Sequence, residues 1–359
     1  MVSEICITEI RRTTGTPVIL DVRTPAEFAR GHIPGAHNLP LFSNEERAIV
    51  GTIHKQEGPA QAMRRGLDLV GPRLAHLAEQ GGGLLNGSPG IIHCWRGGKR
   101  SASVAWLLDF CGNDVAVLKR GYRAFRRHAQ QAFASDQWDL VVLGGRTGSG
   151  KTTLLRTLRS LGEQVIDLEA LANHKGSAFG GIGEPEQPMT EHFENLLYDA
   201  LSACDPGRRI WVENESKSIG RVYIPDALWV RMKAAPLIHL EVPDEQRIAR
   251  LVKMYAGHAE VADLRHAFVR IAKRLGGQHV KAALSALDNG DFTRAAAIAL
   301  RYYDKTYDYN LRHNRSPSIH VLALKDHQDL HGACREIITF ADTRLAKHHA
   351  THSVSTHQI

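Results

Sequence analysis

Cysteine is scarce in this sequence: the 359 residues include five cysteines, and no two of them have CxxC spacing. This usage argues against a disulfide-stapled secreted scaffold and against a cysteine-rich metal site. Long hydrophobic runs are also absent, since no stretch approaches the about 20 apolar residues of a membrane span. The first residues, MVSEICITEIRRTTG, include acidic side chains and no long apolar core. We therefore expect no signal peptide, no membrane association and a cytoplasmic location.

Aromatic residues make up only 6% of the chain, but the hydrophobic share of 43% is that of an ordinary globular protein. The length of 359 residues exceeds the roughly 100–200 residues of one domain, so two domains are expected. The net charge of +7 suits a polyanionic partner such as nucleic acid without requiring one.

Strands and helices alternate in the first third of the chain. A β-branched strand is predicted at 18–22, and TPAEF then has the composition of a helix start. Further on, GIIHC predicts a strand, SASVAWLLDF a helix and DVAVL another strand. This alternation is typical of a parallel sheet covered by helices on both faces.

The stretch HCWRGGKRS places Cys94 between a predicted strand and a predicted helix. A loop over 94–100 can aim several backbone N–H groups inward, and the helix N-terminus adds partial positive charge. Both effects lower a thiol pKa from about 8.5, which would make Cys94 a thiolate nucleophile beside an anion site. The alternative is a buried structural cysteine. The other residues predicted to form this anion loop are Trp95, Arg96, Gly97, Gly98, Lys99 and Arg100.

The stretch LDVRTPAEFARGHIPGAHNLP, together with this loop cysteine, resembles the rhodanese domain over about residues 5–128. The spacing from Cys94 to Arg100 also fits the loop of cysteine phosphatases, and it is one residue longer than we expect of a simple sulfurtransferase. A wider loop suits a larger anion, such as a phosphate-like group or selenophosphate. A rhodanese-like phosphatase therefore stays open. Asp21 and Arg23 either border this pocket or pair with each other.

WDLVVLGGRTGSGKTTLL contains a complete P-loop pattern, G-x4-G-K-T, in a strand–loop–helix context. Glycines let successive N–H groups face a diphosphate, Lys151 reaches its terminal oxygens, and Thr152 can hold a magnesium ion. The residues predicted to bind the diphosphate are Gly145, Arg146, Thr147, Gly148, Ser149, Gly150, Lys151, Thr152 and Thr153.

Further strands at EQVIDL, RIWVEN, APLIHLEV and SIHVLAL predict a P-loop kinase-like fold. Asp167 and Glu213 end two of these strands, so each either serves the metal or its water, or caps a helix. Arg247 and Arg250 lie three apart, which suits either a phosphate-clamping lid or a solvated basic face.

The predicted organisation is α/β throughout, with a rhodanese-like parallel sheet followed by a P-loop kinase-like parallel sheet. We expect a rhodanese-like domain at 1–128, a linker at 129–137, a P-loop domain with a helical C-terminal part at 138–345, and a disordered tail at 346–359.

The order of parts extends the resemblance to nearly the whole chain. A rhodanese-like domain, then GGRTGSGKTTLL, DLEALANHKGSAFGG and RYYDKTYDYN, resembles the tRNA 2-selenouridine synthase family. The resemblance implies a transferase that replaces the sulfur of wobble 2-thiouridine by selenium from selenophosphate, through an S-geranyl intermediate made from geranyl diphosphate. It implies tRNA, through its anticodon loop, as the partner and leaves open whether Cys94 carries a perselenide or receives selenophosphate.

Two segments are candidates for tRNA contact. LKRGYRAFRRHAQQ is basic with Tyr122 and Phe125 interleaved, which fits phosphate contacts with base stacking or else a solvated helix. RYYDKTYDYN fits a stacking surface or an aromatic face that seats a helix on the core. The residues predicted to contact tRNA are Arg120, Arg123, Arg126, Arg127, Tyr302 and Tyr303.

Other function classes fit the same motifs. A P-loop small-molecule kinase fused to a sulfurtransferase would consume ATP with a small acceptor. A regulatory protein whose rhodanese domain senses redox state would turn over nothing. The transferase needs geranyl diphosphate and thiolated tRNA.

Overall fold

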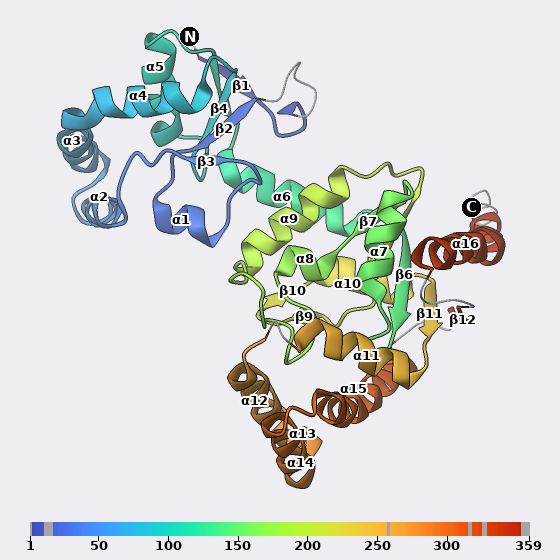
Figure 1. The fold of residues 1–359 in the computed structure, drawn as a ribbon. Coiled ribbons are helices and arrows are strands. Elements are labelled where there is room, and N and C mark those ends of the chain that lie inside the picture. Colours follow the sequence, from blue (N-terminus) through green and yellow to red (C-terminus); the bar gives the residue numbers. More distant parts are fainter. Residues whose placement is uncertain (1, 11–16, 257–258, 315–317, 325–328, 353–359) are drawn as a thin grey trace. The chain divides into compact units, whose positions relative to one another are not determined.

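The computed structural model describes residues 2–10, 17–256, 259–314, 318–324 and 329–352. The chain divides into two compact units (Figure 1). The first comprises residues up to Phe133 together with the segment Pro188–Asp199. The second comprises Ala134–Gln187 and the chain from Ala200 onward. In the described ranges, no helix is both long and apolar enough to cross a membrane.

The first unit contains a five-stranded sheet of order β1-β5-β4-β2-β3, in which every neighbouring pair is parallel. The sheet confirms the predicted strands, which are short and buried at their centre. Its strands are β1 (Ser3–Ile5), β2 (Val18–Asp21), β3 (His37–Asn38), β4 (Gly90–His93) and β5 (Val115–Leu118).

Six helices of the first unit follow these strands or connect them. Thr24 and Ser43 are the N-caps of the first two helices. Each side chain accepts from the backbone N–H of a glutamate three residues later, and that glutamate side chain accepts from the N-cap N–H, which fixes where the helix begins. The six are α1 (Pro25–Arg30), α2 (Asn44–Gln56), α3 (Pro59–Val70), α4 (Leu74–Leu85), α5 (Lys99–Phe110) and α6 (Gly121–Ala134). Because α6 continues to Ala134, the predicted linker at 129–137 is helical over most of its length.

The sequence did not predict that helix α9 (Thr190–Ser202) packs in the first unit. Its residues up to Asp199 belong to that unit, although they come from the second half of the sequence. Asn195 is fully buried, and its amide donates to the Tyr122 hydroxyl and to the His32 carbonyl oxygen, both at 2.7 Å. Phe193 and Leu197 are also fully buried. The first unit therefore extends beyond the predicted 1–128 segment.

The second unit contains a parallel sheet of order β12-β11-β6-β8-β7. Its central strand is apolar along most of its length, as expected where helices cover both faces. The strands are β6 (Asp139–Gly145), β7 (Gln164–Ile166), β8 (Arg209–Glu213), β11 (Leu237–Glu241) and β12 (Ile319–Ala323). All four strands predicted after the P-loop are confirmed. A small antiparallel hairpin joins β9 (Ser218–Ile219) to β10 (Val222–Tyr223).

Helices of the second unit fall into two groups. The first group accompanies the sheet: α7 (Lys151–Ser160), α8 (Leu168–Ala172), α10 (Asp226–Ala234), α11 (Asp244–Tyr255) and α16 (Leu330–His352). Buried residues Cys334 and Ile337 of α16 share a core with Leu154 of α7. Since α16 runs to His352, the predicted tail begins too early at 346, and 353–359 lie outside the described residues.

The second group forms a helical subdomain with a hydrophobic core of its own, drawn in brown below the other elements of this unit in Figure 1. It comprises α12 (Val261–Arg270), α13 (Ala272–Leu275), α14 (Gly277–Asp288) and α15 (Phe292–Asn314). Phe268, Ala283, Leu287 and Ala299 are among its buried residues. The helical C-terminal part that the sequence predicts is thus a separately packed layer.

Candidate functional site

Cys94 lies directly after β4, in a loop that ends where α5 begins at Lys99. Its side chain is only 3% exposed, and its Sγ lies 3.3 Å from the Ser101 hydroxyl and accepts from the Gly98 N–H at 3.4 Å. Gly121 has φ +57°, and a Cβ there would lie 2.2 Å from the Cys94 carbonyl oxygen. The loop therefore requires glycine at the turn that supports it.

Hydrogen bonds control the pKa of Cys94. Burial alone would raise the pKa of this thiol, but the Ser101 hydroxyl and the backbone N–H groups of Gly98, Arg96 and Ser101 favour the thiolate and lower the pKa below its usual value. Arg100 is paired with Glu27 at 3.0 Å. The sequence predicted that inward N–H groups lower the pKa of Cys94, but it did not predict that the Ser101 hydroxyl lowers this pKa as well.

An open cavity of about 740 Å³ surrounds this loop and is lined by more basic than acidic side chains. Its residues are Arg23, Glu27, Arg30, Arg47, Cys94, Trp95, Arg96, Gly98, Lys99, Arg100 and Glu191. Glu191 reaches it from α9 and accepts from the Tyr122 hydroxyl at 3.0 Å. The excess of cations suits an anion beside the Cys94 sulfur.

Three residues beside the loop have structural roles. Arg23 and Asp21 are both buried and pair with each other, with a shortest N–O distance of 2.5 Å. Burial lowers the pKa of His93 to about 4, so its imidazole adds no positive charge at neutral pH. The attraction for an anion therefore comes from the N–H groups and the arginine and lysine side chains.

We predict that Cys94 is the most readily ionised thiol among Cys94, Cys204 and Cys334. Burial raises the pKa of Cys204, and raises that of Cys334 to about 11, whereas hydrogen bonds lower that of Cys94. Iodoacetamide labelling of variants that keep one cysteine each should reach half its maximal rate at the lowest pH for Cys94. A higher midpoint for Cys94 than for Cys204 would contradict the activated loop.

The P-loop joins β6 to α7. Gly148 and Gly150 have φ values of +80° and +86°, and a Cβ at Gly148 would lie 2.8 Å from the Arg247 carbonyl oxygen. Lys151 Nζ donates to the Gly145 carbonyl oxygen at 2.8 Å, and the Tyr307 hydroxyl accepts from the Gly145 N–H at 2.9 Å. The backbone thus has the form that the motif predicts.

Arg247 and Arg250 form neither a lid nor a solvated face. Arg247 is 1% exposed, donates to the Thr147 carbonyl oxygen at 2.9 Å and pairs with Asp304 at 2.5 Å. Arg250 donates to the Ser149 carbonyl oxygen at 3.1 Å. Both guanidinium groups therefore donate hydrogen bonds to P-loop carbonyl oxygens and stabilise the conformation of the loop.

The acidic side chains of the site have three different positions. Asp167 is the N-cap of α8 and accepts from the Ala170 N–H at 2.8 Å, which is the capping role the sequence allowed. Glu213 is 1% exposed and accepts from the Glu169 N–H at 2.5 Å. Glu169 in turn accepts from the Thr152 hydroxyl at 2.8 Å. Glu169, not Asp167 or Glu213, is thus the carboxylate in contact with Thr152.

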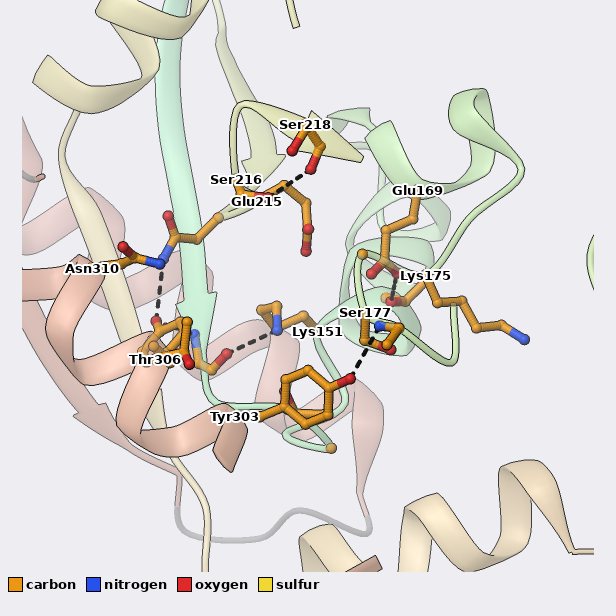
Figure 2. Close-up of a pocket in the computed structure, with 18 of the residues that line it drawn as sticks. Lys151, Glu169, Lys175, Ser177, Glu215, Ser216, Ser218, Tyr303, Thr306 and Asn310 are labelled. Carbon is orange, nitrogen blue, oxygen red and sulfur yellow. Dashed lines mark hydrogen bonds between the residues drawn. The ribbon is translucent and has the colours of Figure 1, made fainter. Parts of the chain in front are cut away.

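Glu215 is a site residue that sequence reasoning missed. Figure 2 shows its carboxylate directed into the pocket, toward the region of Lys151. A Cβ at Gly176, which has φ +67°, would lie 2.3 Å from Glu215 Oε2, so glycine leaves the space that this carboxylate fills. The paired acids in WVENES, two residues apart after a buried strand, were the available signal.

Burial and mutual repulsion raise the pKa values of Glu213 and Glu215. Burial, together with the charge of Glu169, raises the pKa of Glu215 to about 8, although the nearby Lys151 ammonium lowers it. Burial and the neighbouring acids likewise raise the pKa of Glu213 well above its usual value. In the described ranges, no three His, Cys, Asp or Glu side chains gather as a ready-made metal cluster.

We predict that Glu215→Gln makes the protein relatively more stable at pH 8 than at pH 5. The folded pKa of about 8 exceeds the unfolded value of 4.5, so ionisation of Glu215 erodes stability as the pH rises between them. The difference in melting temperature between variant and parent should therefore grow over that window. The exposed Glu245→Gln is the matched control, and equal behaviour of the two variants would contradict the prediction.

A large pocket of about 1090 Å³ opens over the P-loop (Figure 2). Besides the P-loop and the acids, its walls carry basic side chains and three tyrosines of α15. They are Arg156, Lys175, Lys217, Lys233, Arg270, Lys273, Arg274, Tyr302, Tyr303 and Tyr307. The Tyr303 hydroxyl accepts from the Ala178 N–H at 3.0 Å, and Arg274 donates to the Tyr302 hydroxyl at 3.3 Å. Tyr302 and Tyr303 therefore belong to the pocket wall.

The structure changes the predicted role of α6. Tyr122 and Phe125 are 0% and 4% exposed, so the prediction that they stack on bases is wrong. Arg126 donates to the side-chain amide oxygen of Asn195 at 2.7 Å and also pairs with Glu194, so it contacts two residues of α9. Arg120, Arg123 and Arg127 remain exposed. The aromatic residues and Arg126 of this segment therefore serve helix packing, and only the exposed arginines keep the predicted role as candidates for tRNA contact.

Comparisons with known proteins match both halves of the chain. Residues 8–128 match the family model described as rhodanese-like domain, and residues 138–337 match that of the tRNA 2-selenouridine synthase AAA domain. A tRNA 2-selenouridine synthase of Sulfurovum sp. (strain NBC37-1) is 38% identical, covering 84% of this chain and 90% of its own. Those of Cupriavidus pinatubonensis and Proteus mirabilis are 37% and 34% identical, covering 82% and 89% of this chain and 89% and 96% of their own. The chain belongs to the tRNA 2-selenouridine synthase family.

Proposed function

We propose that this enzyme replaces the sulfur of wobble 2-thiouridine in tRNA by selenium, in two steps that use separate sites. The observation that carries the proposal is the pairing, in one chain, of a hydrogen-bonded cysteine loop with a P-loop pocket. A cysteine loop suits chalcogen transfer, and a P-loop suits a diphosphate.

In the first step, the sulfur of 2-thiouridine attacks C1 of geranyl diphosphate. The new C–S bond forms as the C–O bond to diphosphate breaks, and N3 of the uridine loses its proton. The P-loop N–H groups and Lys151 would hold the departing diphosphate, whose negative charge grows as the bond breaks. No nucleotide hydrolysis is required.

Thr152 and Glu169 would hold the magnesium ion that a P-loop with bound diphosphate implies. Their hydroxyl and carboxylate oxygens lie 2.8 Å apart and are the ligand type that magnesium prefers. The ion, when bound, supplies further positive charge toward the diphosphate. Lys151, from the same helix terminus, contributes its ammonium group independently.

In the second step, the selenium of selenophosphate attacks C2 of the base, and geranyl thiol leaves as the C–S bond breaks. Water then cleaves the Se–P bond, which releases phosphate and leaves 2-selenouridine. Alkylation makes this possible because a thiol leaves an electron-poor carbon more readily than a thione sulfur exchanges. Cys94 would serve this step as the group that receives selenophosphate, which would bind beside its sulfur. The cationic cavity around its sulfur supports an anionic selenium donor.

For tRNA, the walls of the P-loop pocket offer basic side chains such as Lys273 and Arg274 beside the ring of Tyr302. Basic groups bind phosphates, and an aromatic ring can stack on an unpaired base of the anticodon loop. The exposed Arg120, Arg123 and Arg127 of the first unit could add phosphate contacts.

Nucleoside mass spectrometry tests the proposal. Thiolated tRNA is incubated with the protein and geranyl diphosphate, then with selenophosphate, and digested. S-geranyl-2-thiouridine should appear first and 2-selenouridine second. A matched reaction with ATP and no geranyl diphosphate should leave the base unchanged. Consumption of ATP with an unmodified base in every reaction would favour the kinase instead.

A further inference from the structure

A second, smaller cavity opens off the P-loop pocket into the helical subdomain. Its volume is about 70 Å³, and it shares Thr147, Ser177, Leu251, Tyr255 and Tyr303 with the larger pocket. Thr147 belongs to the P-loop itself, so the mouth of this cavity lies where a bound diphosphate would be.

The lining of the cavity is apolar beyond that mouth. Its hydroxyl-bearing residues, Thr147, Ser177, Tyr255 and Tyr303, are all shared with the larger pocket, and the deeper wall consists of aliphatic, alanine and phenylalanine side chains. A nucleotide base would leave its polar edges unpaired there, at a substantial cost. A hydrocarbon chain has no such groups.

Helix α15 provides one wall. Tyr303, Ala299, Ala296, Ala295 and Phe292 all line the cavity, and the last four precede Tyr303 by four, seven, eight and eleven residues, which places all five on one helix face. With a rise of 1.5 Å per residue, Ala296 lies about 10 Å and Phe292 about 16 Å along the helix from Tyr303. Small side chains therefore line the middle of this face, between two rings.

We propose that this cavity is the chain site of an isoprenoid diphosphate and that α15 sets the accepted chain length. The inference rests on the proposed function for its reaction. One isoprenoid unit adds four bonds of about 1.5 Å to the main chain, or about 5 Å when extended, close to one helical turn. A ten-carbon chain leaving the P-loop at Tyr303 thus ends near Ala296, and a fifteen-carbon chain meets the ring of Phe292.

Two opposed variants test the assignment with dimethylallyl, geranyl and farnesyl diphosphates, of five, ten and fifteen carbons. Ala296→Phe narrows the middle of the cavity. It should lower kcat/KM for the ten-carbon donor at least tenfold, because each buried methylene contributes about fourfold to affinity. The five-carbon donor should change by less than about twofold. Phe292→Ala should raise the use of the fifteen-carbon donor relative to the ten-carbon donor by about tenfold.

Ala297→Phe is the matched control, since Ala297 is the next residue of α15 and does not line the cavity. Thermal melting verifies that each variant folds. If Ala296→Phe and Ala297→Phe change all three donors equally, or if Phe292→Ala admits no longer chain, the chain site lies elsewhere and the proposal is overturned.

Calorimetric binding separates this inference from the proposed reaction. Geranyl diphosphate should bind the parent at least about tenfold more tightly than inorganic diphosphate, and Ala296→Phe should remove that difference. Equal affinity of the two ligands for the parent would overturn the chain site. Preferential geranyl binding without alkylation of thiolated tRNA would retain the chain site and reject the proposed function.

Discussion

Lys151→Ala is expected to leave 2-thiouridine in tRNA almost unmodified when geranyl diphosphate is supplied. Lys151 lies at the start of α7 and donates to the Gly145 carbonyl oxygen, so its ammonium group lies at the P-loop before any ligand binds. Loss of one preorganised electrostatic group costs about 2–4 kcal/mol in the transition state, a fall of roughly 30- to 1000-fold in rate. The fall in rate is measured by single-turnover geranylation of thiolated tRNA, with nucleoside mass spectrometry as the readout.

Lys175→Ala is the control for a general loss of positive charge in this pocket. Lys175 lines the same pocket but pairs with Glu184 at 2.7 Å. Its removal should slow geranylation far less than that of Lys151. Normal geranylation by a folded Lys151→Ala protein would remove the P-loop from the first step.

Cys94→Ser is expected to stop the pathway one step later, with S-geranyl-2-thiouridine accumulating. Serine keeps the approximate size of the side chain and the hydrogen bond to Ser101, but its hydroxyl is not ionised near neutral pH. Selenium delivery should fall by several orders of magnitude, whereas the geranylation rate should stay within about twofold of the parent. The same nucleoside digest reports both steps.

Cys111→Ser is the matched control, because Cys111 is exposed at the end of α5. It should form 2-selenouridine normally. Ser101→Ala should give an intermediate defect, since it removes a hydrogen bond that lowers the pKa of Cys94. A Cys94→Ser protein that folds and binds tRNA but fails to geranylate would contradict the division of steps.

Local patterns were sufficient to predict the two sheets and the backbone course of the Cys94 loop and the P-loop. The strand GIIH before Cys94 and the strand before GGRTGSGKTT are buried runs bounded by turn residues, and both appear where expected as β4 and β6. Glycines at fixed offsets then dictate the loop backbone, because positive φ values are required at Gly97, Gly148 and Gly150.

Local sequence patterns could not predict contacts between residues that are far apart in the sequence. Asn195 is buried against Tyr122, 73 residues away, and that contact assigns α9 to the first unit. The periodicity of α9 shows that one face is buried but not which unit buries it. Arg247 likewise matches a phosphate clamp in sequence, while its pairing with Asp304 is visible only in the folded chain.

The most direct test of the two-site account supplies tRNA that already carries S-geranyl-2-thiouridine, together with selenophosphate, to both variants. Lys151→Ala should then form 2-selenouridine at nearly the parental rate, because the step that needs the P-loop has been completed. Cys94→Ser should form none. The account would be contradicted if pre-geranylated tRNA failed to rescue a folded Lys151→Ala protein, or if it rescued Cys94→Ser.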